Sequence, residues 1–229
     1  MTIAVRPILH ILLLFGATLV PASSLEAAIM FSMRVGRGPS YPVYVAGNNI
    51  RMDWNKQVAA LWAGKFVAVD SEKQAYFETT GRMMDEAAGQ HRQSAAAGVW
   101  ELVASGQTIG RFRCDRYRLI QMLNGARVIM EESCIAKFAD LPEDYGGQPL
   151  ARIPDAEKLA ALIRAAADRG LRVNPVLLGN FDERGVAIER RLKDGLTITI
   201  TAILAMPDTV VQPQTLGLQT ATSFDALTK

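Results

Sequence analysis

The chain has 229 residues, of which 49% are hydrophobic and 21% are charged, which suits one globular domain with a sizeable core. This composition excludes a disordered chain, a collagen-like repeat and a machine of several domains. Lys and Arg number 25 against 23 Asp and Glu, and no basic run concentrates the field that a phosphate backbone requires, so nucleic acid is not an expected partner.

Residues 1–27 have the layout of a secretory signal peptide. Arg6 gives a cationic start, an apolar stretch runs from Ile8 to Val20, and small residues follow. That stretch is shorter than the roughly 20 residues that cross a bilayer as a helix. We therefore expect cleavage after Ser24, Ala27 or Ala28, a periplasmic or secreted location, and no permanent membrane anchor.

Short β-like runs separated by Gly, Asn, Asp and Lys follow from Ile29 to about Glu78, a pattern typical of an antiparallel meander. The clearest run places Ile50, Met52 and Trp54 on one face of a strand. Further strands are predicted at Val58–Trp62, Phe66–Asp70, Gln74–Glu78, Val99–Val103 and Thr108–Phe112. The glycine pair at residues 36 and 38 indicates a turn.

Two helices are predicted from apolar residues at helical spacing. The first covers Arg82–Arg92, and its recurring positions are Met83, Met84, Ala87, Ala88 and His91. The second begins after the N-cap Asp155 and ends before Gly170, and its apolar stripe is Leu159, Leu162, Ile163 and Ala166. Between the cysteine-containing strands and this helix, Pro142–Pro154 is expected to be a loop.

Two β-like runs around Asn124-Gly125 predict a hairpin that carries both cysteines of the chain. Since thiols pair in an oxidising compartment, Cys114 and Cys134 are expected to form a disulfide. A redox-active pair is the alternative, but the Cys-x-x-Cys spacing is absent.

The register of this hairpin depends on its turn. A three-residue loop places Met122 opposite Ala126, sets the two cysteines directly opposite each other and puts Arg116 across from Glu132. A two-residue turn instead offsets the cysteines by one position. We favour the three-residue loop.

A second hairpin is predicted from Val186–Leu192 and Leu196–Leu204. A two-residue Asp-Gly turn would set charged residues opposite isoleucines on both faces. A three-residue loop pairs Ile188 with Ile200 and leaves one apolar face that only Arg190 interrupts, so we favour it.

Groups for catalysis are scarce. His91 is the one histidine beyond the signal peptide, and no nucleophile elbow, phosphate loop, zinc-binding helix or dinucleotide fingerprint occurs. The carboxylate pairs Asp53 with Asp70 and Glu131 with Glu132 are interpreted as solvated strand charges. We therefore expect no enzyme activity, no metal and no cofactor.

Three segments together resemble a known group of exported proteins. They are Gly-Asn-Asn-Ile-Arg-Met-Asp at Gly47–Asp53, Gly-Arg-Phe-Arg-Cys-Asp-Arg-Tyr at Gly110–Tyr117, and the strand ending in Cys134-Ile-Ala. The likeness is to the LolA-like superfamily, the periplasmic lipoprotein carriers and their lipid-binding relatives. It implies an α+β fold at residues 28–206, in which a strongly curved antiparallel sheet forms a half-barrel with helices covering its concave face. Residues 207–229 are expected to be a partly ordered tail.

The expected function follows from the cavity that such a sheet encloses. Its predicted lining is Ile50, Met52, Trp54, Leu61, Trp62, Met83 and Met84. The leading hypothesis is a non-enzymatic exported protein that holds a lipid or acyl chain there. The same residues also suit a filled core, and the alternative is a cell-envelope protein-interaction module. A solvent-reachable void favours the first, and a dry core with an exposed apolar patch favours the second.

Overall fold

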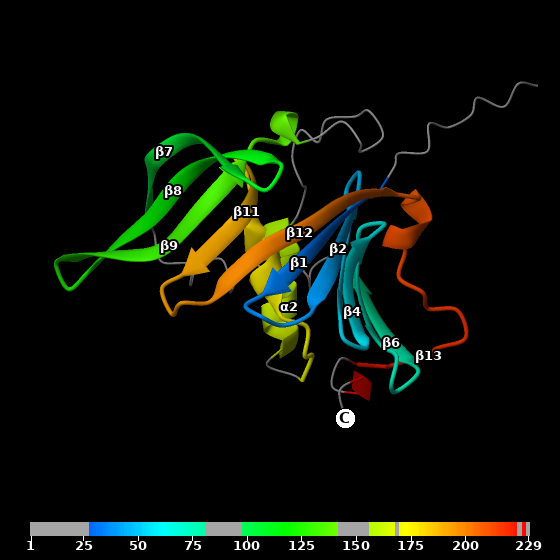
Figure 1. The fold of residues 1–229 in the computed structure, drawn as a ribbon. Coiled ribbons are helices and arrows are strands. Elements are labelled where there is room, and N and C mark those ends of the chain that lie inside the picture. Colours follow the sequence, from blue (N-terminus) through cyan, green and yellow to red (C-terminus); the bar gives the residue numbers. More distant parts are fainter. Residues whose placement is uncertain (1–27, 81–97, 142–155, 168–169, 224–225, 228–229) are drawn as a thin grey trace, which may run out of the picture.

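The structure is a computed structural model, and it describes residues 28–80, 98–141, 156–167, 170–223 and 226–227. Most of them belong to one large, curved β-sheet of 13 strands (Figure 1). Helical residues are few, and the architecture of the described part is α+β.

The first six strands form the predicted antiparallel meander. They are β1 (Ala28–Val35), β2 (Ser40–Ala46), β3 (Asn49–Trp54), β4 (Gln57–Trp62), β5 (Lys65–Asp70) and β6 (Ala75–Thr80). In β3 the alternation is as expected, since Ile50 and Met52 are buried while Arg51 and Asp53 are half-buried.

The remaining strands come from the second half of the chain. They are β7 (Val99–Ile109), β8 (Phe112–Leu123), β9 (Ala126–Ala136), β10 (Phe181–Asp182), β11 (Gly185–Leu192), β12 (Thr197–Met206) and β13 (Gln219–Thr220). Three short 3-10 helices lie between or after them: η1 (Phe138–Asp140), η2 (Pro175–Asn180) and η3 (Asp208–Val211).

The expectation of two separate strands at Val99–Val103 and Thr108–Phe112 was wrong. The structure has the single strand β7, and Phe112 opens β8. Register shifts between Leu102 and Gln107 absorb the intervening residues as irregularities of the β7–β8 ladder. The strand therefore continues through Gly106.

The strand order is β13-β6-β5-β4-β3-β2-β1-β12-β11-β9-β8-β7, with β10 paired to β11 outside this path. Because β13 and β7 stand at opposite ends of the order, the sheet is open. It is also mixed, which corrects the purely antiparallel expectation: β13 runs parallel to β6, pairing Gln219 with Ala75. The chain after β12 thus reaches β6, at the end of the meander, and adds β13 beside it.

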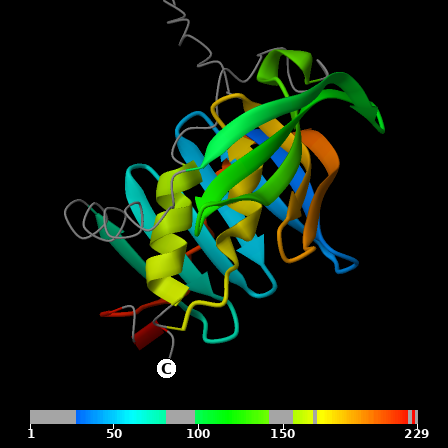
Figure 2. The ribbon, with the colours of Figure 1, turned by 90° about the vertical axis from the view of Figure 1, so that its left-hand side faces the viewer.

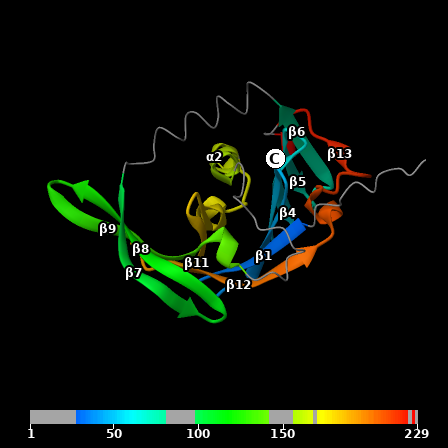
Figure 3. The ribbon, with the colours of Figure 1, turned by 90° about the horizontal axis from the view of Figure 1, so that it is seen from above.

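The second predicted helix is confirmed as α2 (Ala156–Ala167). Its predicted stripe is at most 5% exposed at every position, Leu159, Leu162, Ile163 and Ala166. The helix contacts β4 and η2, and Figures 2 and 3 show it inside the curve of the sheet. The predicted helix at residues 82–92, the loop at 142–154 and the N-cap Asp155 lie outside the described residues.

The register of the hairpin β11–β12 is confirmed. Glu189 lies opposite Thr199 and Arg190 opposite Ile198, which continues the ladder expected for a three-residue loop. Gly195 has a φ of 83° in that loop. Ile198 and Ile200 are consequently buried.

One main core joins the sheet, α2 and η2. Its largest fully buried side chains include Phe31, Met33, Ile50, Met52, Leu159, Ile163, Leu177, Leu178, Ile188, Ile198, Ile203 and Leu227. Leu227 belongs to the C-terminal 23 residues, so this segment contributes to the core. Within the described residues, no helix has the length and apolarity needed to span a membrane.

Candidate functional site

Three of the residues predicted to line a cavity lie together in the main core. Ile50 and Met52 are 0% exposed and Leu61 is 5% exposed. Ile50 faces Leu61 across the β3–β4 ladder. Met83 and Met84 lie outside the described residues.

The two tryptophans of the predicted set are separated. Trp54 is half-buried against the main core and stacks on Tyr41, with ring centroids 3.8 Å apart and planes 13° from parallel. Trp62 follows Leu61 directly on β4, so it points to the opposite face of the sheet. It packs there against a small second cluster that includes Ala28 and Val211.

Three pockets of about 440, 330 and 220 Å³ lie on the described part of the molecule. Trp54 lines the first of them, while Ile50, Met52 and Leu61 line none of the three. Within the described residues no group of three or more His, Cys, Asp or Glu side chains is placed to hold a metal ion.

The most exposed apolar surface belongs to β7, β8 and β9, a three-stranded ribbon that we call the arm. Figure 3 shows it extending away from the strands that surround α2. Six of the eight large apolar side chains that are exposed in the described residues lie on it: Val99 (66%), Leu102 (55%), Val103 (43%), Met122 (63%), Leu123 (39%) and Ile129 (47%). We call these six the arm patch.

The arm patch spans the three strands and has members on both faces of the arm. Val99 on β7 pairs with Ile120 on β8, which in turn pairs with Ile129 on β9. Met122 lies two residues beyond Ile120 on the same face, whereas Leu123 at the turn and Leu102, which pairs with Tyr117, lie on the opposite face. The patch therefore occupies the part of the arm that includes the tip of the β8–β9 hairpin.

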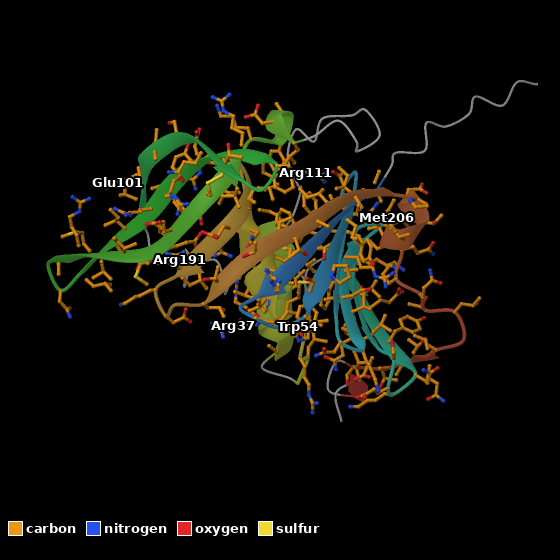
Figure 4. The ribbon with its side chains drawn as sticks, viewed as in Figure 1. Arg37, Trp54, Glu101, Arg111, Arg191 and Met206 are labelled. Carbon is orange, nitrogen blue, oxygen red and sulfur yellow. A yellow bond between two sulfur atoms is a disulfide. The ribbon has the colours of Figure 1, made fainter. Side chains whose placement is uncertain are left out.

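The predicted disulfide is confirmed. Cys114 and Cys134 are joined in the described structure, with Cα atoms 5.4 Å apart (Figure 4). The predicted register was wrong, however. Asn124 and Gly125, with φ of 51° and 79°, form a two-residue turn, so Leu123 rather than Met122 pairs with Ala126.

A bulge explains how the disulfide forms in this register. The two-residue turn alone would offset the cysteines by one residue and direct their side chains to opposite faces. The ladder shifts once more between Leu119 and Ile120, where Met130 is the extra residue on β9. Cys134 then pairs with Arg116, two residues from Cys114, and both sulfurs lie on one face.

Ion pairs join several of the charged side chains on the arm. Glu132 accepts hydrogen bonds of 2.8 Å from both Arg116 and Arg118, and Glu101 on β7 pairs with Arg127 on β9. The hydrogen bond from Arg118 is the main reason that the pKa of Glu132 is lowered; burial opposes it and Arg116 adds to it. The expected contact between Arg116 and Glu132 thus exists, although the two residues are not directly opposite.

An aromatic and ionic cluster fixes the arm against β10. The guanidinium of Arg184 lies 4.3 Å from the ring centroid of Trp100 and 5.1 Å from that of Tyr117. It also binds both carboxylate oxygens of Asp182, at 2.6 and 2.7 Å. Burial tends to raise the pKa of Asp182, but the hydrogen bonds from Arg184 outweigh it and the pKa is lowered.

A buried ion pair lies at the junction of β9 and β11. Arg190 and Glu131 are each 8% exposed and are joined by two hydrogen bonds of 2.9 and 2.6 Å. Ser133 donates to the same carboxylate, and the carbonyl of Val176 accepts from Arg190. The expectation that Glu131 is a solvated strand charge was therefore wrong. The single charge on the apolar face of β11 was the signal, because a buried arginine requires a carboxylate partner.

Comparison with known proteins gives no family. No family model and no curated protein matches the chain. A solved structure of PNGF-II has a TM-score of 0.39 and 7% identity over 82% of this chain and 30% of its own. The chain thus spans less than a third of PNGF-II, and at that TM-score the likeness assigns neither fold family nor function. The LolA-like resemblance stays a prediction.

Proposed function

We propose that the protein is an exported, non-catalytic binding protein of the cell envelope that docks on a protein partner through the arm. The observation that carries this proposal is the arm patch, six exposed apolar side chains on adjacent strands. Such a concentration of exposed apolar side chains on one ribbon is typical of an interaction site, whereas single exposed apolar residues scattered over a surface are not.

The edge of the arm favours a partner segment in extended conformation. β7 is the last strand in the sheet order, and within the described residues no strand pairs with its outer edge. Its eleven residues leave backbone donors and acceptors that an added strand can satisfy. Val99, Leu102 and Val103 on the same strand then supply apolar contacts.

The charge pattern favours a protein over an anionic membrane. A membrane-binding surface presents unpaired Lys and Arg around its apolar residues. On the arm, Arg127 is paired with Glu101, and Arg116 and Arg118 share Glu132. An apolar patch whose neighbouring arginines are held in ion pairs suits the surface of another protein.

Two features support export. The disulfide between Cys114 and Cys134 is typical of an oxidising compartment rather than of the cytosol. The leader-like pattern of residues 1–27 agrees with this. A periplasmic or secreted location is therefore part of the proposal.

Photo-crosslinking in an exporting host tests the docking surface. A photoreactive amino acid at Val99 is expected to give an adduct with one recurring protein, and Leu102→Asp is expected to abolish it. The matched control is Leu204→Asp, because Leu204 is 47% exposed but lies on β12, outside the arm. The purified partner must then bind the purified wild-type protein at least about tenfold more tightly than Leu102→Asp. Phospholipid adducts alone, or equal loss with both variants, would contradict the proposal.

Lipid binding in the concave face is the second candidate. The curve of the sheet around α2 favours it (Figure 3), since a curved sheet closed by helices can enclose an acyl chain. Extraction of the purified mature protein followed by mass spectrometry tests it. A stoichiometric acyl lipid supports this candidate, and a lipid-free protein that also takes up no fatty-acid probe rejects it.

A further inference from the structure

A second surface lies on the strands of the meander, away from the arm. It is the pocket of about 440 Å³ formed by the β3–β4 turn, the β5–β6 turn and the chain that follows α2. Its lining residues are Trp54, Asn55, Lys56, Gln57, Asp70, Glu72, Lys73, Gly170 and Arg172. Figure 4 labels Trp54 at this end of the molecule and Glu101 on the arm, well apart.

Hydrogen bonds hold the three segments of the pocket in place. Asp70, which is 4% exposed, accepts from the side-chain amide of Gln57 at 2.9 Å and from the backbone N–H groups of Glu72 and Lys73. The amide oxygen of Gln57 accepts from the backbone N–H of Arg172 at 2.7 Å. The pocket is therefore built before any ligand arrives, which lowers the entropy cost of binding.

Trp54 gives the pocket one aromatic wall. One face of its indole is covered by Tyr41 in a stacked arrangement. The surface that Trp54 contributes to the pocket thus comes from its other face or its edge, in an orientation that Tyr41 fixes. Such a wall suits the C–H face of a sugar ring. The pocket lining has no second aromatic residue, so it could not enclose a nucleobase from both sides.

The charges of the pocket leave a positive excess. Lys56 is paired with Glu72 at 2.8 Å, and Asp70 is engaged by the hydrogen bonds that hold the turns. Among the described residues, the side chains of Lys73 and Arg172 have no carboxylate partner in the ion pairs of the structure. Two cations beside an aromatic wall recognise a group that carries a carboxylate or phosphate.

We propose that this pocket binds an acidic saccharide. The sugar ring stacks on Trp54, its hydroxyl groups reach the amide of Asn55 and the carboxylate of Glu72, and its anionic group pairs with Lys73 and Arg172. This site is independent of the arm, and its ligand class does not follow from the docking function.

Tryptophan fluorescence gives the test, because the chain has three tryptophans. In the background Trp62→Phe/Trp100→Phe, Trp54 is the only reporter. Titration with trigalacturonic acid is expected to give a saturable change in emission. Maltotriose, a neutral trisaccharide, is expected to bind at least about tenfold more weakly, since that ratio corresponds to the loss of one charge-assisted contact.

Isothermal titration calorimetry on single variants, with the other tryptophans kept, separates the contributions of the individual pocket residues to affinity. Lys73→Ala and Arg172→Gln are each expected to weaken trigalacturonic acid about fivefold or more, and Trp54→Ala to remove detectable binding. The matched control is Lys65→Ala, which changes a half-buried lysine on β5 outside the pocket and should leave affinity unchanged. If Trp54→Ala fails to fold, Trp54→Leu serves in its place.

Several outcomes overturn the proposal. These are no binding of trigalacturonic acid, equal binding of maltotriose, affinity that persists without the Trp54 ring, or tighter binding of a mononucleotide such as uridine monophosphate. None of these results bears on the arm, so the docking proposal is tested separately.

Discussion

The strands around α2 and the arm use similar apolar residues in opposite ways. Ile50 on β3 is 0% exposed because the sheet curves around α2 and η2, whereas Met122 on β8 is 63% exposed because the end of the arm extends beyond them. Both positions lie within β-strands of the same sheet. The difference shows that strand pattern determines which side chains share a face, while the packing of other elements determines whether that face is buried.

The junction between these two regions is polar. The arm joins the rest of the sheet through β9 and β11, where Glu131 and Arg190 form their buried pair. A buried ion pair is a weak source of stability but is very sensitive to the loss of one member. We therefore expect a single substitution at the junction of β9 and β11 to lower the free energy of unfolding more than a substitution elsewhere.

Arg190→Met is the most disruptive change that we predict. It leaves the carboxylate of Glu131 buried with Ser133 as its remaining side-chain donor, and the free energy of unfolding should fall by about 3–5 kcal/mol. Urea denaturation followed by circular dichroism measures the loss. The double variant Arg190→Met/Glu131→Leu is the control, because it removes both charges and should recover most of the stability. A single variant as stable as wild type would show that the pair is not buried.

The second prediction compares the two regions directly. Ile50→Ala should lower the free energy of unfolding by about 2–5 kcal/mol, since it removes a fully buried side chain from the core. Met122→Ala, a truncation of comparable size on the arm, should change it by no more than about 0.5 kcal/mol. Urea denaturation of both variants checks the difference. Similar losses would mean that the arm patch is covered in the folded protein.

The sequence predicted the fold of the meander and of α2 well, because both depend on local periodicity. Alternation in β3 and the stripe beginning at Leu159 were sufficient to place them. The β11–β12 register was also predictable, since a one-residue slip would have exposed Ile198 and Ile200. In each case one face of the element is buried, so the spacing of apolar residues determines where the element lies and how it pairs.

The cysteine hairpin shows why other features were not predictable. Its strands carry charged or apolar residues on both faces, so a shift of register costs little burial. The two-residue turn and the bulge at Met130 compensate each other, and only their combination brings Cys114 and Cys134 together. Likewise, the pocket at Trp54 depends on three segments that are distant in sequence, and no local motif marks it.

The third prediction concerns the disulfide itself. Cys114→Ser/Cys134→Ser removes a link between residues 20 positions apart, and should lower the free energy of unfolding by about 2–4 kcal/mol. Thermal denaturation under non-reducing conditions measures this. Dithiothreitol added to the wild type should reproduce the loss and leave the serine variant unchanged. A further effect of reductant on the variant would contradict the assignment.

Deletion of Met130 sharpens the same point. Without the extra residue the ladder becomes regular in the register of the two-residue turn, and Arg116 still lies opposite Cys134, so the disulfide should persist. Insertion of one alanine after Met130 should instead move Cys134 to the face opposite Cys114, and both thiols should then react with a thiol reagent in the folded protein. The control is the substitution Met130→Ala, which keeps the residue count and should keep the bond. Reactive thiols in the deletion variant would contradict the assignment of Met130 as the bulge residue.

The smallest effect is predicted for the ion pairs on the arm. Glu132→Gln should lower the free energy of unfolding at pH 7 by less than about 1 kcal/mol, because the carboxylate is partly exposed and screened by solvent. The pKa of Glu132 in the folded protein lies below its ordinary value of 4.5, so its stabilisation is complete above that pH and disappears as the pH falls through the folded value. Urea denaturation at pH 7 and at pH 3 should therefore show a difference between wild type and variant that shrinks at the lower pH. Glu101→Gln breaks a more exposed pair with Arg127 and should cost less at pH 7. A loss for Glu132→Gln that grows on acidification would mean that Arg116 and Arg118 do not stabilise the ionised carboxylate. The ion pairs on which the docking proposal rests would then be absent.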